Sequence, residues 1–149
     1  MVLGDGRITL QQAPTAAYDL LILDAFSSDA IPLHLLTREA LQLYLSRLAP
    51  EGVIALHISN RYLNLEPMLA GLVRQEGLHG VARVDDNVSA EEIAKGRLGS
   101  HWIMLARRAD LLASLDASHG WRVPAADARV RPWTDDYSNI LSVLTYSRR

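Results

Sequence analysis

Cysteine is absent from the 149 residues. This absence excludes disulfides, Cys-ligated zinc sites, iron–sulfur clusters and thiol nucleophiles. The five histidines show neither the H-x-x-x-H nor the H-E-x-x-H spacing of zinc-binding helices, so we expect no metal site. A chain of this length still buries about 68–70% of the surface that it exposes when unfolded, and a hydrophobic core therefore forms without cross-links.

An excess of one charge and long apolar runs are lacking as well. The 15 basic and 17 acidic residues leave a net charge of −2, which argues against nucleic-acid binding through a charged face. The longest apolar runs, such as Leu20–Leu23 and Val53–Leu56, are far shorter than the roughly 18 residues that span a bilayer. The first residues also lack the basic start and the apolar region of a signal peptide. We expect a soluble cytoplasmic protein with no membrane segment in this chain.

Two of the apolar runs predict β-strands. Leu20–Leu23 is too short for a helix and has the composition of a strand covered on both faces, and Val53–Ile58 is a second run of this kind. Between them, Thr37 is a candidate N-cap. The helix that follows places apolar residues along one buried stripe, namely Leu41, Tyr44, Leu45 and Leu48. Two such strands joined by a helix predict a βαβ unit with parallel strands.

Similar patterns continue along the chain. A second helix is expected between the candidate cap Asn64 and the stop signal Gly77. Ser89 and Glu92 have the spacing of a capping box, which predicts a short helix. Residues 116–149 are expected to be irregular for most of their length. Further expected elements are strands at Gly80–Val84, His101–Ala106 and Ile140–Tyr146 and a short helix at Asp110–Leu115. We interpret residues 1–149 as one α/β domain.

The glycine-rich loop of doubly wound folds is missing. Such folds usually carry G-x-G-x-x-G in the first βα turn, and this pattern occurs nowhere in the chain. The Gly-x-Gly pair at Gly4 and Gly6 follows only three residues, so it is not a turn preceded by a complete βα unit. Either the fold is a smaller α/β sheet or its first βα units are absent.

Two carboxylates follow the first predicted strand. Asp24 lies at its carboxyl end, and Asp29 comes five residues later in the next loop. Binding sites in parallel sheets are built at this edge, and a partly buried carboxylate there binds an amine and accepts its proton. The alternative is that Asp24 caps the loop and that Asp29 is a solvated turn residue. The pattern alone leaves both interpretations open.

Other polar residues have two interpretations as well. Asp5 either accepts a hydrogen bond from a ligand amino group, while the glycines beside it let the backbone approach, or it bonds to its own backbone in a tight turn. The cluster Trp133–Asn139 either lines a site or forms a polar turn anchored by one packed Trp. His57 and His101 lie in or beside strands, and we interpret them as hydrogen-bonded packing residues.

Short motifs are spread over nearly the whole chain, at Gly4–Arg7, Tyr18–Asp24, Ser27–Asp29, Asp24–Pro32, Pro50–Val53, His57–Tyr62 and Pro132–Asn139. Together they resemble the second half of the spermidine synthase family, polyamine aminopropyltransferases with a methyltransferase-like Rossmann fold. The longer motifs resemble the bacterial spermidine-synthase-like subgroup. The resemblance implies that the chain is the C-terminal portion of a catalytic domain. It also implies a partial Rossmann-like sheet of the S-adenosylmethionine-dependent methyltransferase type, mostly parallel, with an antiparallel strand near the C-terminal end and without the first βα units.

The resemblance also implies roles for single residues. Asp5, flanked by Gly4 and Gly6, would hold the adenine amino group of decarboxylated S-adenosylmethionine, a co-substrate rather than a tightly bound cofactor. Asp24 would help to take a proton from the attacking amine, and Asp29 would help to bind a diamine such as putrescine. The implied reaction is displacement at the carbon beside a sulfonium, which gives methylthioadenosine and a longer polyamine. Such a step needs an uncharged amine aligned behind the leaving sulfur.

Three functions stay open at this point. The first is aminopropyl transfer, with weak or no activity expected of the isolated chain, because the family's glycine-rich loop and ribose-binding residue would precede Gly4. The second is a non-catalytic α/β remnant, and the third is an S-adenosylmethionine-dependent methyltransferase. The absent units would pair with the Leu20–Leu23 strand, so its exposed edge predicts a homodimer or a higher oligomer.

Overall fold

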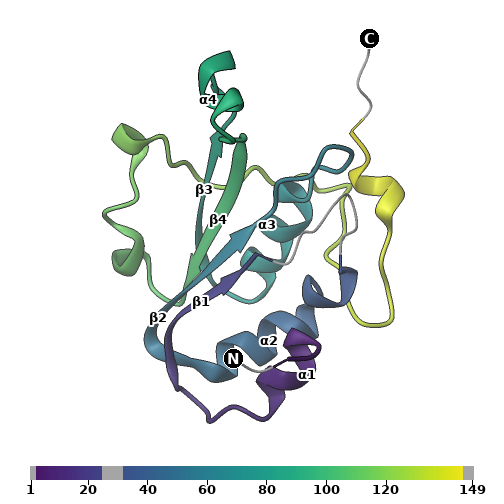
Figure 1. Ribbon diagram of the computed structural model, residues 1–149. Helices are drawn as coiled ribbons and strands as arrows, with labels where there is room; N and C mark the ends of the chain where they lie inside the picture. The colour runs from purple at the N-terminus through teal and green to yellow at the C-terminus, as the bar shows by residue number, and fades with distance from the viewer. Residues whose placement is uncertain (1–2, 25–31, 146–149) are drawn as a thin grey trace.

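The computed structural model describes residues 3–24 and 32–145. Within these ranges, four strands form one sheet in the order β1-β2-β4-β3 (Figure 1). Their bounds are β1 Tyr18–Leu23, β2 Leu48–His57, β3 His79–Asp85 and β4 Ser100–Ala106. β1 and β2 are parallel, whereas β4 is antiparallel to both of its neighbours. β1, β2 and β3 therefore run in one direction and β4 runs against them, so that the sheet mixes parallel and antiparallel pairs. This arrangement confirms the predicted α/β class and a partial Rossmann-like sheet.

Two helices cover one face of the sheet. They are α2, at Arg38–Arg47, and α3, at Glu66–Gln75, and their buried side chains pack with those of β2 and β4 in a common core. The predicted cap of the first helix is confirmed, because Thr37 Oγ1 accepts the Ala40 N–H at 3.2 Å. The second helix begins two residues after its predicted cap, and Asn64 Oδ1 still accepts the N–H of its first residue at 3.3 Å.

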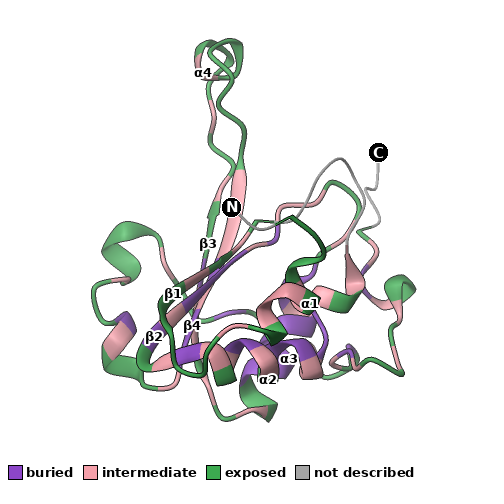
Figure 2. Ribbon diagram, turned by 60° about the horizontal axis from the view of Figure 1, so that its bottom comes forward, coloured by how far each residue is buried: buried purple, intermediate pink, exposed green. Residues whose placement is uncertain are grey.

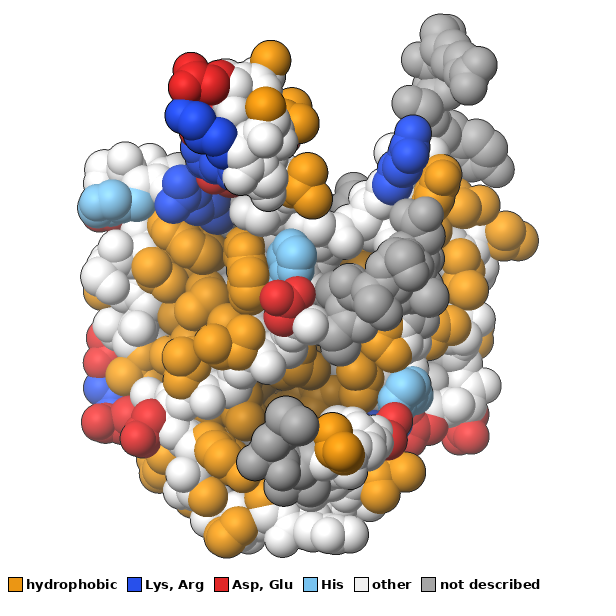
Figure 3. All heavy atoms as spheres, viewed as in Figure 1, with side chains coloured by type: hydrophobic (Ala, Val, Ile, Leu, Met, Phe, Trp, Pro, Cys, Tyr) orange, Lys and Arg blue, Asp and Glu red, His pale blue; other side chains and the backbone are white. Residues whose placement is uncertain are grey.

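The other face of the sheet is open at β1. Alternate side chains of this strand point to opposite faces, and Leu21 and Leu23 pack against the core. Leu20 and Ile22 are 50% and 60% exposed, and a surface depression of about 410 Å³ runs from them to Trp102 and Met104 on β4. Figure 2 shows the mixture of exposed and buried ribbon, and Figure 3 shows the hydrophobic side chains gathered over this face. The expectation of a strand covered on both faces is wrong, since the described helices cover one side only.

Shorter elements complete the fold. The Ser89–Glu92 capping box is confirmed at the start of α4, Ala90–Ala94. The sequence did not predict α1, Gly6–Gln11, which lies beside α2. Among residues 3–24 and 32–145, no helix has the length and apolar character needed to cross a bilayer. The 3-10 helices are η1 at Leu33–Leu35, η2 at Ala109–Leu112, η3 at Ala117–His119 and η4 at Ile140–Val143.

Two predicted elements near the C-terminus are corrected. The helix expected at Asp110–Leu115 is the single 3-10 turn η2. The strand expected at Ile140–Tyr146 is replaced over its first residues by η4, and Tyr146 lies outside the described residues. The physical reason is local, because the backbone N–H and hydroxyl of Ser142 both donate to Asn139 O, at 3.3 and 2.7 Å, and close a turn. Within the described part of this segment, residues 140–145, the strand-like pairing is the bridge between Leu63 and Leu144.

Candidate functional site

The predicted catalytic carboxylate lies at the carboxyl edge of the sheet. Asp24 directly follows β1, and the parallel register of β1 with β2 pairs Leu23 with Leu56. The next residues of the two strands, Asp24 and His57, are therefore neighbours, and Asp24 Oδ1 lies 2.6 Å from His57 Nδ1. The Asp24 side chain is 57% exposed, not partly buried as the sequence argument required. Asp24 thus lies at the predicted edge of the sheet, and its carboxylate contacts the His57 imidazole.

The histidine belongs to a longer hydrogen-bonded array. His57 Nε2 lies 2.7 Å from Ser59 Oγ, and Ser59 Oγ accepts the backbone N–H of His101 at 2.7 Å. The imidazole stacks on the indole of Trp102, with ring centroids 4.7 Å apart and planes 20° from parallel. The interpretation of His57 as a hydrogen-bonded packing residue did not foresee its contact with Asp24. The signal that was available is the parallel register of the two predicted strands.

A cavity of about 320 Å³ lies between α1 and β1 and brings two predicted site residues together. Gly6 lines it from the first turn of α1, and Asp24 lines it from the end of β1. The rest of the wall is mostly apolar and consists of Leu10, Leu21, Ile22, Leu23, Leu35 and Tyr44. Binding sites for small molecules usually enclose about 300–1,000 Å³ with mostly apolar walls and few polar groups. The cavity has this character, with a carboxylate at one side.

Asp5 is the N-cap of α1. Its Oδ1 accepts the Ile8 N–H at 2.9 Å, and its Oδ2 lies 2.8 Å from His34 Nε2. The backbone N–H of Ile8 holds the pKa of the Asp5 carboxyl below its usual value. Gly4 has a φ of 139°, a left-handed conformation that favours glycine and leads the chain into the cap. The local bond predicted for Asp5 is thus present, with a short helix in place of a simple turn.

Asp29 and the cluster Trp133–Asn139 are the remaining predicted site positions. Asp29 lies outside the described residues. Of the two interpretations of the cluster Trp133–Asn139, the structure has the polar turn, since Thr134 and Tyr137 exchange backbone hydrogen bonds and the Trp133 side chain is fully buried. Asp135 in this turn accepts two hydrogen bonds from the Arg7 guanidinium, at 2.8 and 2.6 Å, which lower the pKa of its carboxyl. This pair fixes α1 to the C-terminal segment and so supports one wall of the cavity.

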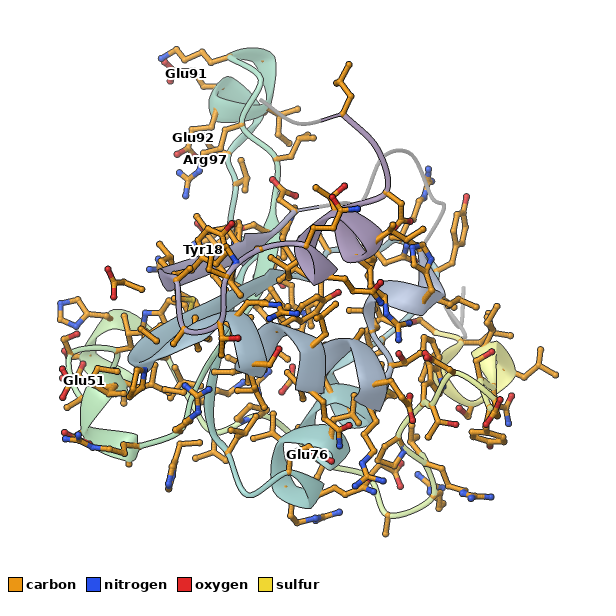
Figure 4. All side chains as sticks on the ribbon, turned by 90° about the horizontal axis from the view of Figure 1, so that it is seen from below. Tyr18, Glu51, Glu76, Glu91, Glu92 and Arg97 are labelled. Carbon is orange, nitrogen blue, oxygen red and sulfur yellow. The ribbon has the colours of Figure 1, made fainter. Side chains whose placement is uncertain are left out.

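Charged clusters elsewhere in the described parts of the chain have structural partners. Figure 4 shows Glu91, Glu92 and Arg97 on the segment that carries α4, which projects from the ends of β3 and β4 (Figure 1). Arg97 pairs there with Glu92 and with Asp85. No group of three or more His, Asp or Glu side chains within residues 3–24 and 32–145 has an arrangement that would hold a metal ion.

No family model and no curated protein matches the chain. Among solved structures, the chain is similar to a probable spermidine synthase from Corynebacterium glutamicum, with a TM-score of 0.57 and 18% identity over 93% of this chain and 55% of that one. It is also similar to MnmC2 from Aquifex aeolicus, with a TM-score of 0.46 and 18% identity over 86% of this chain and 38% of that one. The chain thus spans about half the length of the spermidine synthase, and the likeness shows a shared fold.

Proposed function

We propose that this chain carries the base-bearing half of an aminopropyltransferase-like site, which acts on a diamine and a nucleoside sulfonium. The observation that carries the proposal is the position of Asp24, at the carboxyl end of a parallel strand and on the wall of the cavity that Gly6 also lines. The fold shared with a probable spermidine synthase supports it. The motifs support the finer assignment to the bacterial spermidine-synthase-like subgroup and to polyamine synthesis.

The proposed reaction forms one bond and breaks another. The amine nitrogen attacks the aminopropyl carbon beside the sulfonium of decarboxylated S-adenosylmethionine, and the carbon–sulfur bond breaks to release methylthioadenosine. The proton that the nitrogen loses goes to the Asp24 carboxylate. The apolar residues of the cavity wall would hold the aliphatic part of the amine away from water, which keeps the reacting atoms aligned.

The remaining roles follow from the resemblance. Asp5 is proposed to accept a hydrogen bond from the adenine amino group, since each carboxylate oxygen has two lone pairs and its bonds to Ile8 and His34 use one on each. Gly4 and Gly6 would let the nucleoside approach the backbone. Asp29 is proposed to bind the distal amine of the diamine.

The test measures methylthioadenosine released from decarboxylated S-adenosylmethionine and putrescine at high protein concentration. We expect slow release by the wild-type chain and a loss of at least about 100-fold in D24N, because removing a general base typically costs 10²- to 10⁴-fold. The matched control is D19N, which changes an exposed aspartate of the same strand and should retain the wild-type rate. Equal rates for D24N and D19N would contradict the assignment of Asp24 as the base.

A calorimetric titration separates aminopropyl transfer from the two alternative functions. Calorimetry with decarboxylated S-adenosylmethionine and with S-adenosylmethionine distinguishes an aminopropyltransferase from a methyltransferase, because the two co-substrates differ at the carboxylate. Binding of the decarboxylated compound alone supports the proposal. Binding of neither would favour a non-catalytic α/β domain. The open apolar face at Leu20 and Ile22 also fits a domain of this kind.

A further inference from the structure

We propose that His57 is a positioning residue for Asp24, held in a single tautomer by its contacts with Asp24 and Ser59, so that the three side chains act as one hydrogen-bonded unit. The proposal deepens the proposed function and rests on the role of Asp24 given there. Its geometry comes from two contacts, 2.6 Å between Asp24 Oδ1 and His57 Nδ1 and 2.7 Å between His57 Nε2 and Ser59 Oγ.

The carboxylate sets the direction of these hydrogen bonds, because Asp24 Oδ1 can only accept and His57 Nδ1 therefore carries the donated proton. The proton of the neutral imidazole is thus on Nδ1, and His57 donates Nδ1–H to Asp24 Oδ1. In this tautomer His57 Nε2 has no proton and accepts the hydroxyl proton of Ser59, whose Oγ accepts the His101 N–H through a lone pair.

The orientation of the ring is fixed by the sheet. His57 and Trp102 are paired residues of β2 and β4, and their rings are stacked. The loop after β2 is tied to β4 as well, because the Ile58 N–H donates to His101 O at 2.8 Å. Strands hold side chains more tightly than loops do, and the imidazole is therefore a rigid support for a carboxylate at the strand end.

The two carboxylate oxygens of Asp24 therefore have different roles. His57 holds Oδ1 and with it the plane of the carboxylate, which leaves Oδ2 to receive a proton from an amine. A neutral Nδ1–H donor stabilises the ionised carboxylate without adding a positive charge that would repel a cationic diamine. The unit thus holds the carboxylate in one orientation beside the cavity.

The first test reads the tautomer and needs no activity. In the full chain labelled with ¹⁵N-histidine, a long-range ¹H–¹⁵N spectrum at neutral pH should show His57 as the Nδ1–H tautomer. In D24A, which removes the acceptor of the Nδ1 proton, the Nε2–H form should appear, while the signals of the exposed His79 stay unchanged. A wild-type His57 in the Nε2–H form, or no change in D24A with an otherwise native spectrum, would overturn the proposal.

The second test reads the effect on turnover. H57F removes the donor to Asp24, and we expect kcat to fall about 10- to 100-fold, as misplacement of a reacting group does, with KM for the sulfonium co-substrate within about twofold. H57N keeps a donor at the position of Nδ1 and should recover most of the loss, and H79N is the control. Wild-type kcat in H57F would overturn the positioning role. If the wild-type chain transfers no aminopropyl group, the proposed function fails and the tautomer measurement alone decides the present proposal.

Discussion

Glu66 is a buried carboxylate that joins distant parts of the chain. It lies in the first turn of α3, accepts two hydrogen bonds from the Arg122 guanidinium and one from the Ala125 N–H at 2.6 Å, and lies 2.9 Å from His101 Nε2. Burial raises the pKa of Glu66, but the contacts with His101, Arg122 and Ala125 together outweigh it and lower the pKa from 4.5 to about 2. The charged form is therefore favoured in the folded state.

This shift predicts a loss of stability in acid. Because the folded-state pKa is lowered, the stabilisation is complete above about pH 4.5 and disappears as the pH falls towards 2. A lowering of this size corresponds to about 3 kcal/mol. Urea unfolding of E66Q should show a lower free energy of unfolding at pH 7 and a smaller decrease between pH 5 and pH 2 than the wild type. E91Q, at an exposed residue, is the control, and an equal decrease in E66Q and wild type would contradict the prediction.

Asp5 has a structural role and a proposed binding role, and two variants separate them. D5A removes the acceptor for the Ile8 N–H and should lower the melting temperature. D5S keeps a capping oxygen, so its melting temperature should stay close to that of the wild type, but its shorter side chain does not reach an adenine amino group. Calorimetry should then show at least about a tenfold loss of nucleoside affinity in D5S. Wild-type affinity in D5S would leave Asp5 with the capping role alone.

At the scale of elements, the pairing of β1 with β2 is irregular near Gly52. The register shifts between the pairs Tyr18–Leu48 and Leu20–Val53, and Gly52 lies within the part of β2 that this shift skips. A Cβ on Gly52 would be 2.6 Å from Leu48 Cγ and 3.0 Å from Tyr18 O. G52A should therefore lower the free energy of unfolding by about 1–3 kcal/mol, as overpacking does. Gly6 has no neighbour within 4 Å of such an atom, and G6A should be neutral or stabilising in the same urea experiment.

Local signals in the sequence predicted elements better than they predicted contacts between elements. The caps Thr37 and Ser89 depend on residues three positions apart, and both were predicted correctly. The contact of Asp24 with His57 joins residues 33 positions apart, and it follows only when the register of two parallel strands is known. The exposure of β1 was missed for a related reason, because an apolar run specifies a strand but not how many of its faces are covered.

At the scale of the whole molecule, the described helices leave one face of the sheet without a covering layer (Figure 1). Doubly wound α/β sheets usually carry helices on both faces. β1 is the edge strand of the described sheet. Its exposed side chains Leu20 and Ile22 form part of the open apolar face next to this edge. An exposed edge beside an exposed apolar face favours pairing with another chain.

A homodimer or higher oligomer is accordingly expected, with the edge and open face of β1 in the contact. L20K places a charge in the middle of this surface and should shift the protein to monomer in sedimentation velocity at micromolar concentration. The matched control is I93K, because Ile93 is similarly exposed, at 54%, but lies on α4 away from β1. I93K should sediment like the wild type. A wild-type chain that is monomeric throughout this range would contradict the prediction, and an oligomer that survives L20K would place the contact on another surface.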